Sequence, residues 1–167
     1  KHKPFAGVYG TKMIPNKDYD PDVRFRQLVE AIKFVYASAY SKAAKDYCKA
    51  VGDNIEDEKM AVIIQKMVGK RYYKRFYPEL SGVARSYNYY PVKPAIPEDG
   101  VVNLALGLGK TIVDGSISWT YSPAYPKVDP PFGSVKELLK GTQTEYWSVN
   151  MGELTQYDPV KETEYLL

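Results

Sequence analysis

The apolar pattern is most regular between residues 21 and 51, where it follows the period of an α-helix. Asp20 offers a side-chain acceptor to the first turn, Pro21 occupies a position where its missing N–H costs nothing, and Gly52 stands where a left-handed cap is expected. Apolar side chains between these ends recur at steps of three and four residues. They are Phe25, Leu28, Val29, Ile32, Val35, Tyr36, Ala39, Ala43, Tyr47 and Val51. The pattern predicts one long helix over 21–51 that packs one face against a core.

The remainder of the chain has the composition of strands joined by loops. The run 59–68 is apolar on both faces apart from Gln65, which is typical of a central strand. Three further strands are predicted at 82–90, 100–106 and 142–151, with a short helix at 136–140 and a proline-rich loop at 122–133. No linker divides the chain, so we expect one domain over 1–167. The predicted fold class is α+β, with the long helix packed on a mainly antiparallel sheet.

Composition and charge narrow the function classes. With 44% apolar and 26% charged residues, the chain is typical of a soluble globular protein. Its 23 basic and 20 acidic residues are too nearly balanced to imply a nucleic-acid or membrane partner without local clustering. One cysteine, Cys48, allows no internal disulfide, and no apolar run approaches a membrane span. Together with the lack of a secretory signal, these features predict a cytoplasmic location.

A basic and aromatic run at 70–80, KRYYKRFYPEL, contains several of the 16 tyrosines of the chain. Such a run is found on surfaces that stack bases and neutralise phosphates. Tyrosine is also common on half-buried strands, and a short basic run is usually a solvated loop. Because no nucleic-acid recognition motif accompanies the run, we expect no nucleic-acid partner.

The stretch VVNLALGLGKTIVDG at 101–115 contains half of a phosphate-binding loop. The loop pattern requires glycine five positions before Gly109, and Leu104 occupies that position. We therefore predict that this segment is not a phosphate loop. Gly107 and Gly109 are instead expected to take positive φ in a tight turn.

Five short segments occur in a recognisable order. They are FAGVYGTKMIPN (5–16), AIKFVYASAY (31–40), MAVIIQKMV (60–68), SGVA (81–84) and GLGKTIVDG (107–115). This series resembles the ATP-binding domain of the phosphoenolpyruvate synthase (pyruvate, water dikinase) and pyruvate phosphate dikinase family. That domain shows FAGQ…T, KxxWAS, AVxVQxMV, SGVAF and WGLGE. The resemblance is strongest over residues 4–115.

What the resemblance implies is part of an ATP-grasp-like nucleotide-binding domain. In this family ATP phosphorylates a histidine on a separate domain, and the phosphate then passes to pyruvate on another domain of the same chain. ATP and Mg²⁺ are the expected cofactors. His2, at the extreme terminus, is not expected to be the phosphocarrier. The family's arginine-bearing and metal-binding segments are expected to lie outside the chain, so we expect the isolated chain to be inactive.

The resemblance also assigns candidate ATP-binding residues. Gly7 and Thr11 match the phosphate-side loop, and Gln65, Lys66, Met67 and Val68 match the segment that passes the adenine. A simple turn at the first group and an interior strand end at the second explain the same residues without a ligand. No residue is assigned a catalytic or a metal-binding role. The chain departs from WGLGE at Leu106 and Lys110, and it has Asn103 where the family often has glutamate.

Three hypotheses remain open from the sequence. The first is the ATP-binding domain of a phosphoenolpyruvate synthase-like enzyme. The second is the same lobe of a related phosphotransferase with another acceptor. The third is a non-enzymatic binding module with a tyrosine-rich basic surface, which an exposed basic face with stacked rings at 70–76 would favour.

Overall fold

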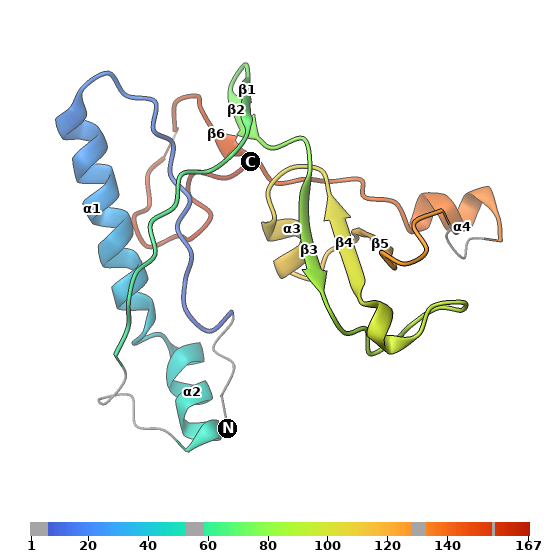
Figure 1. Ribbon diagram of the computed structural model, residues 1–167. Helices are drawn as coiled ribbons and strands as arrows, with labels where there is room; N and C mark the ends of the chain where they lie inside the picture. The colour runs from blue at the N-terminus through green and yellow to red at the C-terminus, as the bar shows by residue number, and fades with distance from the viewer. Residues whose placement is uncertain (1–6, 53–58, 128–132, 155) are drawn as a thin grey trace. The chain divides into compact units, whose positions relative to one another are not determined.

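The computed structural model describes residues 7–52, 59–127, 133–154 and 156–167, and its elements are shown in Figure 1. His2 lies outside the described residues. Backbone contacts divide the chain into two compact units. The first consists of Lys1–Met67, Tyr73–Arg75 and Val149–Leu167, and the second of Val68–Tyr72 and Phe76–Ser148. The single domain over 1–167 stays a prediction.

The first unit contains two helices where the sequence pattern predicts one. The helix α1 spans Pro21–Ser38 and α2 spans Lys42–Val51. As predicted, Asp20 accepts a hydrogen bond from the amide of Asp22, and Gly52 closes α2 with φ of 74°. The single helix over 21–51 is wrong because Ser41 caps a new helix, its Oγ accepting from the amide of Ala44 at 3.1 Å. The spacing of apolar residues continues through this break, because it carries no information about a capping side chain such as that of Ser41.

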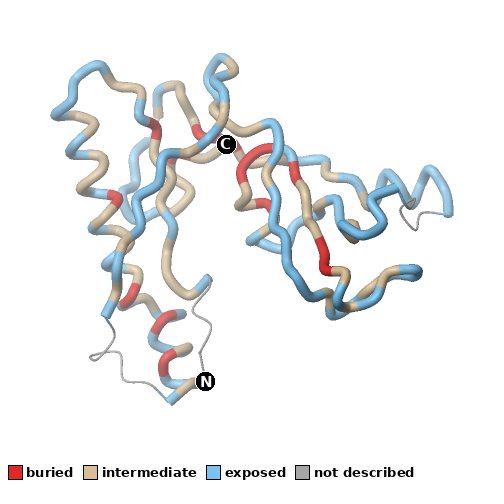
Figure 2. The backbone as a smooth tube through the Cα atoms, viewed as in Figure 1, coloured by how far each residue is buried: buried red, intermediate tan, exposed pale blue. Residues whose placement is uncertain are grey.

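The burial of the two helices also differs from the predicted stripe. Phe25 and Tyr36 are exposed, whereas Ala31, Ala44 and Cys48 are buried (Figure 2). Small side chains are buried where another backbone approaches the helix closely. The extended segment before α1 makes such an approach, because a Cβ on Gly10 would lie 2.8 Å from the ring of Phe34. The segment before α1 therefore packs against Phe34 of this helix.

The C-terminal segment completes the first unit. The Lys12 ammonium donates to the carbonyls of Pro159 and Lys161. Lys17 donates in the same way to the carbonyl of Gly152, and the hydroxyl of Tyr157 donates to Glu30 on α1. Burial lowers the pKa of Lys12, against the opposing effect of nearby carboxylates. These contacts join residues 152–161 to α1 and to the segment before it.

The second unit is built on an antiparallel sheet in the order β3-β4-β5, as the predicted fold class requires. Its strands are β3 (Ser81–Arg85), β4 (Val101–Ala105) and β5 (Trp119–Tyr121). The register pairs Ser81 with Ala105 and Leu104 with Trp119. The unit also contains η2 (Pro97–Asp99), α3 (Lys110–Val113) and α4 (Val135–Lys140). Its buried residues follow β4 and the turn after it, including Val101, Ala105 and Leu108 (Figure 2).

The strand predictions are confirmed only in part. The predicted strand 100–106 is β4 and the predicted helix 136–140 is α4, but 82–90 is a strand only as far as Arg85. Of 142–151, only β6 (Val149–Asn150) is a strand. The sequence did not predict β5, α3 or the hairpin of β1 (Lys70–Tyr72) and β2 (Arg75–Tyr77). The two hairpin strands form a sheet with β6, in the order β1-β2-β6.

The predicted central strand 59–68 is wrong. Residues 59–69 are extended, but they belong to no strand, and Figure 1 draws them as a plain tube. Ile63 and Val68 are 81% and 85% exposed. A strand requires a neighbouring strand to pair its backbone groups, and no described segment supplies one here. The composition of the run predicted that it is buried, but it did not show which neighbouring strand would bury it.

Candidate nucleotide-binding site

The predicted phosphate-side loop is a turn held against α1. Gly7 has φ of +80°, which favours glycine, and a Cβ there would meet nothing within 4 Å. Both Gly7 and Thr11 are exposed. The amide of Gly10 donates to Ser38 Oγ at 2.8 Å, and this hydroxyl donates to the carbonyl of Val35 at 2.6 Å. Gly10, which the sequence analysis did not single out, therefore fixes the loop on the helix and leaves Gly7 and Thr11 open to solvent.

The predicted adenine segment is also open. Gln65, Lys66 and Val68 are exposed, and Met67 is half-buried. Because residues 65–68 belong to no strand, their amide and carbonyl groups are not committed to a sheet ladder. Main-chain groups of this kind can contact the edge of a base, and a half-buried methionine can pack on its face.

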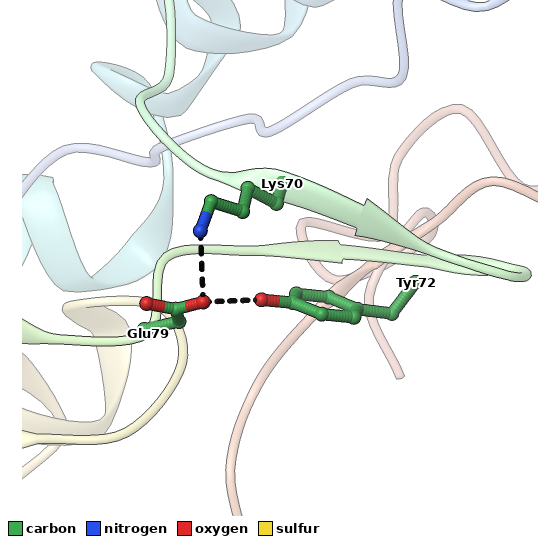
Figure 3. Close-up of polar contacts among 3 residues, drawn as sticks. All are labelled: Lys70, Tyr72 and Glu79. Atoms are coloured by element: carbon green, nitrogen blue, oxygen red, sulfur yellow. Dashed lines mark hydrogen bonds and ion pairs between the residues drawn. The ribbon is translucent and has the colours of Figure 1, made fainter.

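The segment is followed by a polar cluster on the hairpin (Figure 3). Glu79 Oε1 accepts a hydrogen bond from the hydroxyl of Tyr72 at 2.6 Å. It also forms an ion pair with Lys70 Nζ at 3.1 Å. The hydrogen bond to Glu79 raises the pKa of Tyr72 to about 12. The same bond and the Lys70 charge lower the pKa of Glu79. This cluster was missed because its members lie on both sides of the hairpin turn, although the alternation of Lys70 and Tyr72 is consistent with a strand.

The cluster predicts a loss of stability at high pH. A tyrosine whose pKa is raised in the folded state stabilises the fold below its unfolded pKa of 10.0, and this contribution is lost as the pH rises toward about 12. Between pH 10 and 12 we therefore expect the wild type to lose more unfolding free energy than Tyr72→Phe. Chemical denaturation at each pH measures this. Tyr90→Phe, at an 89% exposed ring, is the matched control and keeps the wild-type slope; equal slopes in all three proteins would contradict the prediction.

In the glycine turn at 107–111, backbone amides already donate hydrogen bonds to carbonyls of the protein itself. Gly107 has φ of 83°, as predicted, whereas Gly109 has φ of −58° and begins α3, so that part of the prediction is wrong. The amide of Gly107 donates to the carbonyl of Pro78 at 3.2 Å, and that of Leu108 donates to Trp147 at 2.9 Å. Two amides that would face a phosphate in a P-loop are thus engaged by carbonyls. This supports the prediction that the turn contacts no phosphate.

The first unit contains a pocket of about 840 Å³ that is lined in part by carboxylates. It lies along the C-terminal segment and is lined by Glu153, Asp158 and Glu164, with Lys161 beside them. Three carboxylates disfavour a triphosphate in this space. None of the predicted ATP-binding residues lines it.

The described residues contain no group of three or more histidine, cysteine, aspartate or glutamate side chains placed to hold a metal ion. Across the same described ranges, none of the helices combines the length and apolar character that crossing a bilayer requires.

An α+β domain with an antiparallel sheet and open main-chain segments is compatible with a nucleotide-binding class of protein. The family model for the pyruvate phosphate dikinase AMP/ATP-binding domain matches residues 1–165. The chain belongs to this family, and the resemblance found in the sequence is confirmed. Neither the curated proteins nor the solved structures contain a match to the chain.

Proposed function

We propose that this chain binds ATP for an enzyme that phosphorylates pyruvate, as phosphoenolpyruvate synthase does, through a phosphohistidine on another domain. The observation that carries the proposal is the family match over residues 1–165, together with the ordered segments over 4–115. The proposal includes an ATP-grasp-like architecture and a cytoplasmic location for the whole enzyme. A related phosphotransferase with another acceptor uses the same lobe and is the second candidate.

Residues of this chain are assigned to ATP binding, and none is assigned to the phosphoryl-transfer step. Main-chain groups of Gln65 and Lys66 would read the adenine edge, and Met67 and Val68 would contact its faces. Gly7 and Thr11 would border the phosphates, because a bare backbone allows close approach and a hydroxyl donates a hydrogen bond. Mg²⁺ neutralises the transferring phosphates in such enzymes. Among the described residues, no three or more histidine, cysteine, aspartate or glutamate side chains are placed to hold such an ion.

Removing the Met67 side chain tests the adenine contact. We expect Met67→Ala to weaken ATP binding by roughly 5- to 10-fold, since about 1 to 1.4 kcal/mol of apolar contact is lost. Isothermal titration calorimetry with ATP and Mg²⁺ measures the change. The matched control is Met151→Ala at another half-buried methionine, which should bind ATP like the wild type.

Two results separate the possible failures. If the full-length enzyme binds no ATP at any accessible concentration, the proposed function fails. If Met151→Ala weakens binding as much as Met67→Ala, the assignment of the 65–68 segment fails while ATP binding stands. The acceptor is tested with the full-length enzyme, where ATP consumption that depends on pyruvate supports the first candidate and consumption without pyruvate supports the second.

A further inference from the structure

The last residue of α1 holds the predicted phosphate-side loop through one hydroxyl. Ser38 Oγ accepts a hydrogen bond from the amide of Gly10 at 2.8 Å and donates one to the carbonyl of Val35 at 2.6 Å. A serine hydroxyl has a single hydrogen to donate. Because the helix carbonyl takes this hydrogen, the oxygen serves as an acceptor toward the loop. Ser38 therefore ties the backbone of the loop to a fixed point on α1.

Close packing reinforces this hydrogen bond. A Cβ on Gly10 would lie 2.8 Å from Cε1 of Phe34 and 3.2 Å from Cβ of Ser38, so glycine allows the loop to approach the helix this closely. The Lys12 ammonium lies 4.8 Å from the centroid of the same Phe34 ring. Gly10 and Lys12 are the two neighbours of Thr11 in the chain. The loop is thus held on α1 on both sides of Thr11.

This anchoring determines which groups of the loop face solvent. Thr11 is exposed between the two anchored residues, and Gly7 is exposed three residues before Gly10. The amide of Gly10 already donates to Ser38, so contacts to a ligand fall to other groups of the loop. A loop that is ordered before its ligand arrives avoids part of the entropy cost of binding. The anchor therefore favours ligands that contact this loop.

We propose that Ser38 is a positioning residue, which holds the loop of Gly7 and Thr11 in place for the phosphates of ATP. This inference rests on the proposed function, because the same loop is assigned there to the phosphates. Ser38 contacts the backbone of the loop rather than the nucleotide. Its removal should therefore weaken the binding of ATP and leave the binding of adenosine, which carries no phosphate, unchanged.

Calorimetry with the full-length enzyme tests the role of the hydroxyl. We expect Ser38→Ala to weaken the binding of ATP and Mg²⁺ by roughly 3- to 10-fold, the effect of one lost hydrogen bond. The affinity for adenosine, measured by displacement, should stay at the wild-type value. The matched control is Ser41→Ala. It removes a capping hydroxyl that accepts from the amide of Ala44 at 3.1 Å, so it also destabilises a helix end, but it should bind ATP like the wild type.

A double-mutant cycle tests the packing of the loop independently of the hydroxyl. Gly10→Ala places a Cβ against the Phe34 ring, so the loop must shift and ATP binding should weaken. Phe34→Leu removes the ring atoms that this Cβ would meet. We therefore expect Gly10→Ala to weaken ATP binding less in the Phe34→Leu background than in the wild type. The cycle cancels any effect of Phe34→Leu itself, including the loss of its contact with Lys12.

The possible results separate this inference from the proposed function. Equal weakening of ATP and adenosine binding by Ser38→Ala would overturn the inference, because the serine would then have only a structural role. An equal loss of ATP affinity in Ser41→Ala would overturn it as well, as would an equal effect of Gly10→Ala in both backgrounds. Each of these results leaves the proposed function standing, since the enzyme still binds ATP. If the wild-type enzyme binds no ATP, the proposed function fails and this inference fails with it.

Discussion

Gly107→Ala is expected to lower the free energy of unfolding by about 2 to 5 kcal/mol. Two costs add at this position. Its φ of 83° costs an L-residue roughly 1 to 2 kcal/mol, and an added Cβ would lie 2.7 Å from the carbonyl oxygen of Trp147. Because that oxygen is backbone and accepts from the amide of Leu108, it has little freedom to move, and overpacking of this kind costs about 1 to 3 kcal/mol. Urea denaturation measures the sum.

Two neighbouring glycines separate these costs. Gly115 has φ of 75° but open space around its Cα, so Gly115→Ala should lose only the conformational part, about 1 to 2 kcal/mol. Gly109 has φ of −58°, and its nearest neighbour would be 3.9 Å from a new Cβ. Gly109→Ala is therefore expected to be neutral or to stabilise by about 0.4 to 1 kcal/mol. A loss at Gly109→Ala equal to that at Gly107→Ala would contradict the turn geometry.

The 167-residue chain by itself is expected to bind ATP weakly or not at all and to transfer no phosphoryl group. In phosphoryl transfer, positioned cations and metal ions supply nearly all of the rate enhancement. From the family resemblance, we expect this chain to carry no counterpart of the family's phosphate-clamping arginine, its ATP-binding lysine or its acidic metal-binding pair. Loss of one arginine that stabilises the transition state costs on the order of 10³ in rate or more. A pyruvate-dependent ATP-consumption assay in Mg²⁺ measures turnover.

A complete enzyme of the same family, assayed in parallel, shows that the assay detects turnover. Calorimetry with ATP on the same sample of the 167-residue chain reports binding separately from chemistry. Micromolar binding together with measurable turnover would contradict the prediction, because the clamp and the metal ligands would then have to be residues of this chain.

Local signals in the sequence were reliable where neighbouring residues decide the structure. Asp20 before Pro21 predicts the start of α1, and Gly52 predicts the left-handed end of α2, because a cap acts within a few residues of itself. The strand predicted at 100–106 is β4, and the helix predicted at 136–140 is α4, because the composition of a short run is also local information. The break at Ser41 was missed because the apolar spacing continues across it and predicts one helix, although the Ser41 hydroxyl caps a second one.

Pairing between distant residues was not visible in the sequence. Residues 59–68 have the composition of a buried strand, yet whether they pair depends on what another segment offers. The hairpin at 70–77 was found only as a basic and aromatic run, and the role of Glu79 in it required the folded chain. The candidate ATP-binding residues came from family resemblance, and the structure adds their exposure and the contact that holds Gly10 on α1.

The sequence by itself therefore determined the family, the α+β class, the helix caps at Asp20 and Gly52, and the positive φ of Gly107. These depend on residue types in a fixed order or on contacts within one turn. Only the tertiary structure decided the division of the long helix, the absence of a strand over 59–69 in the described chain and the stacking of Tyr72 on Tyr77 in a hairpin. The physical reason is that burial and strand pairing are properties of two segments together, whereas a periodic pattern describes one segment alone.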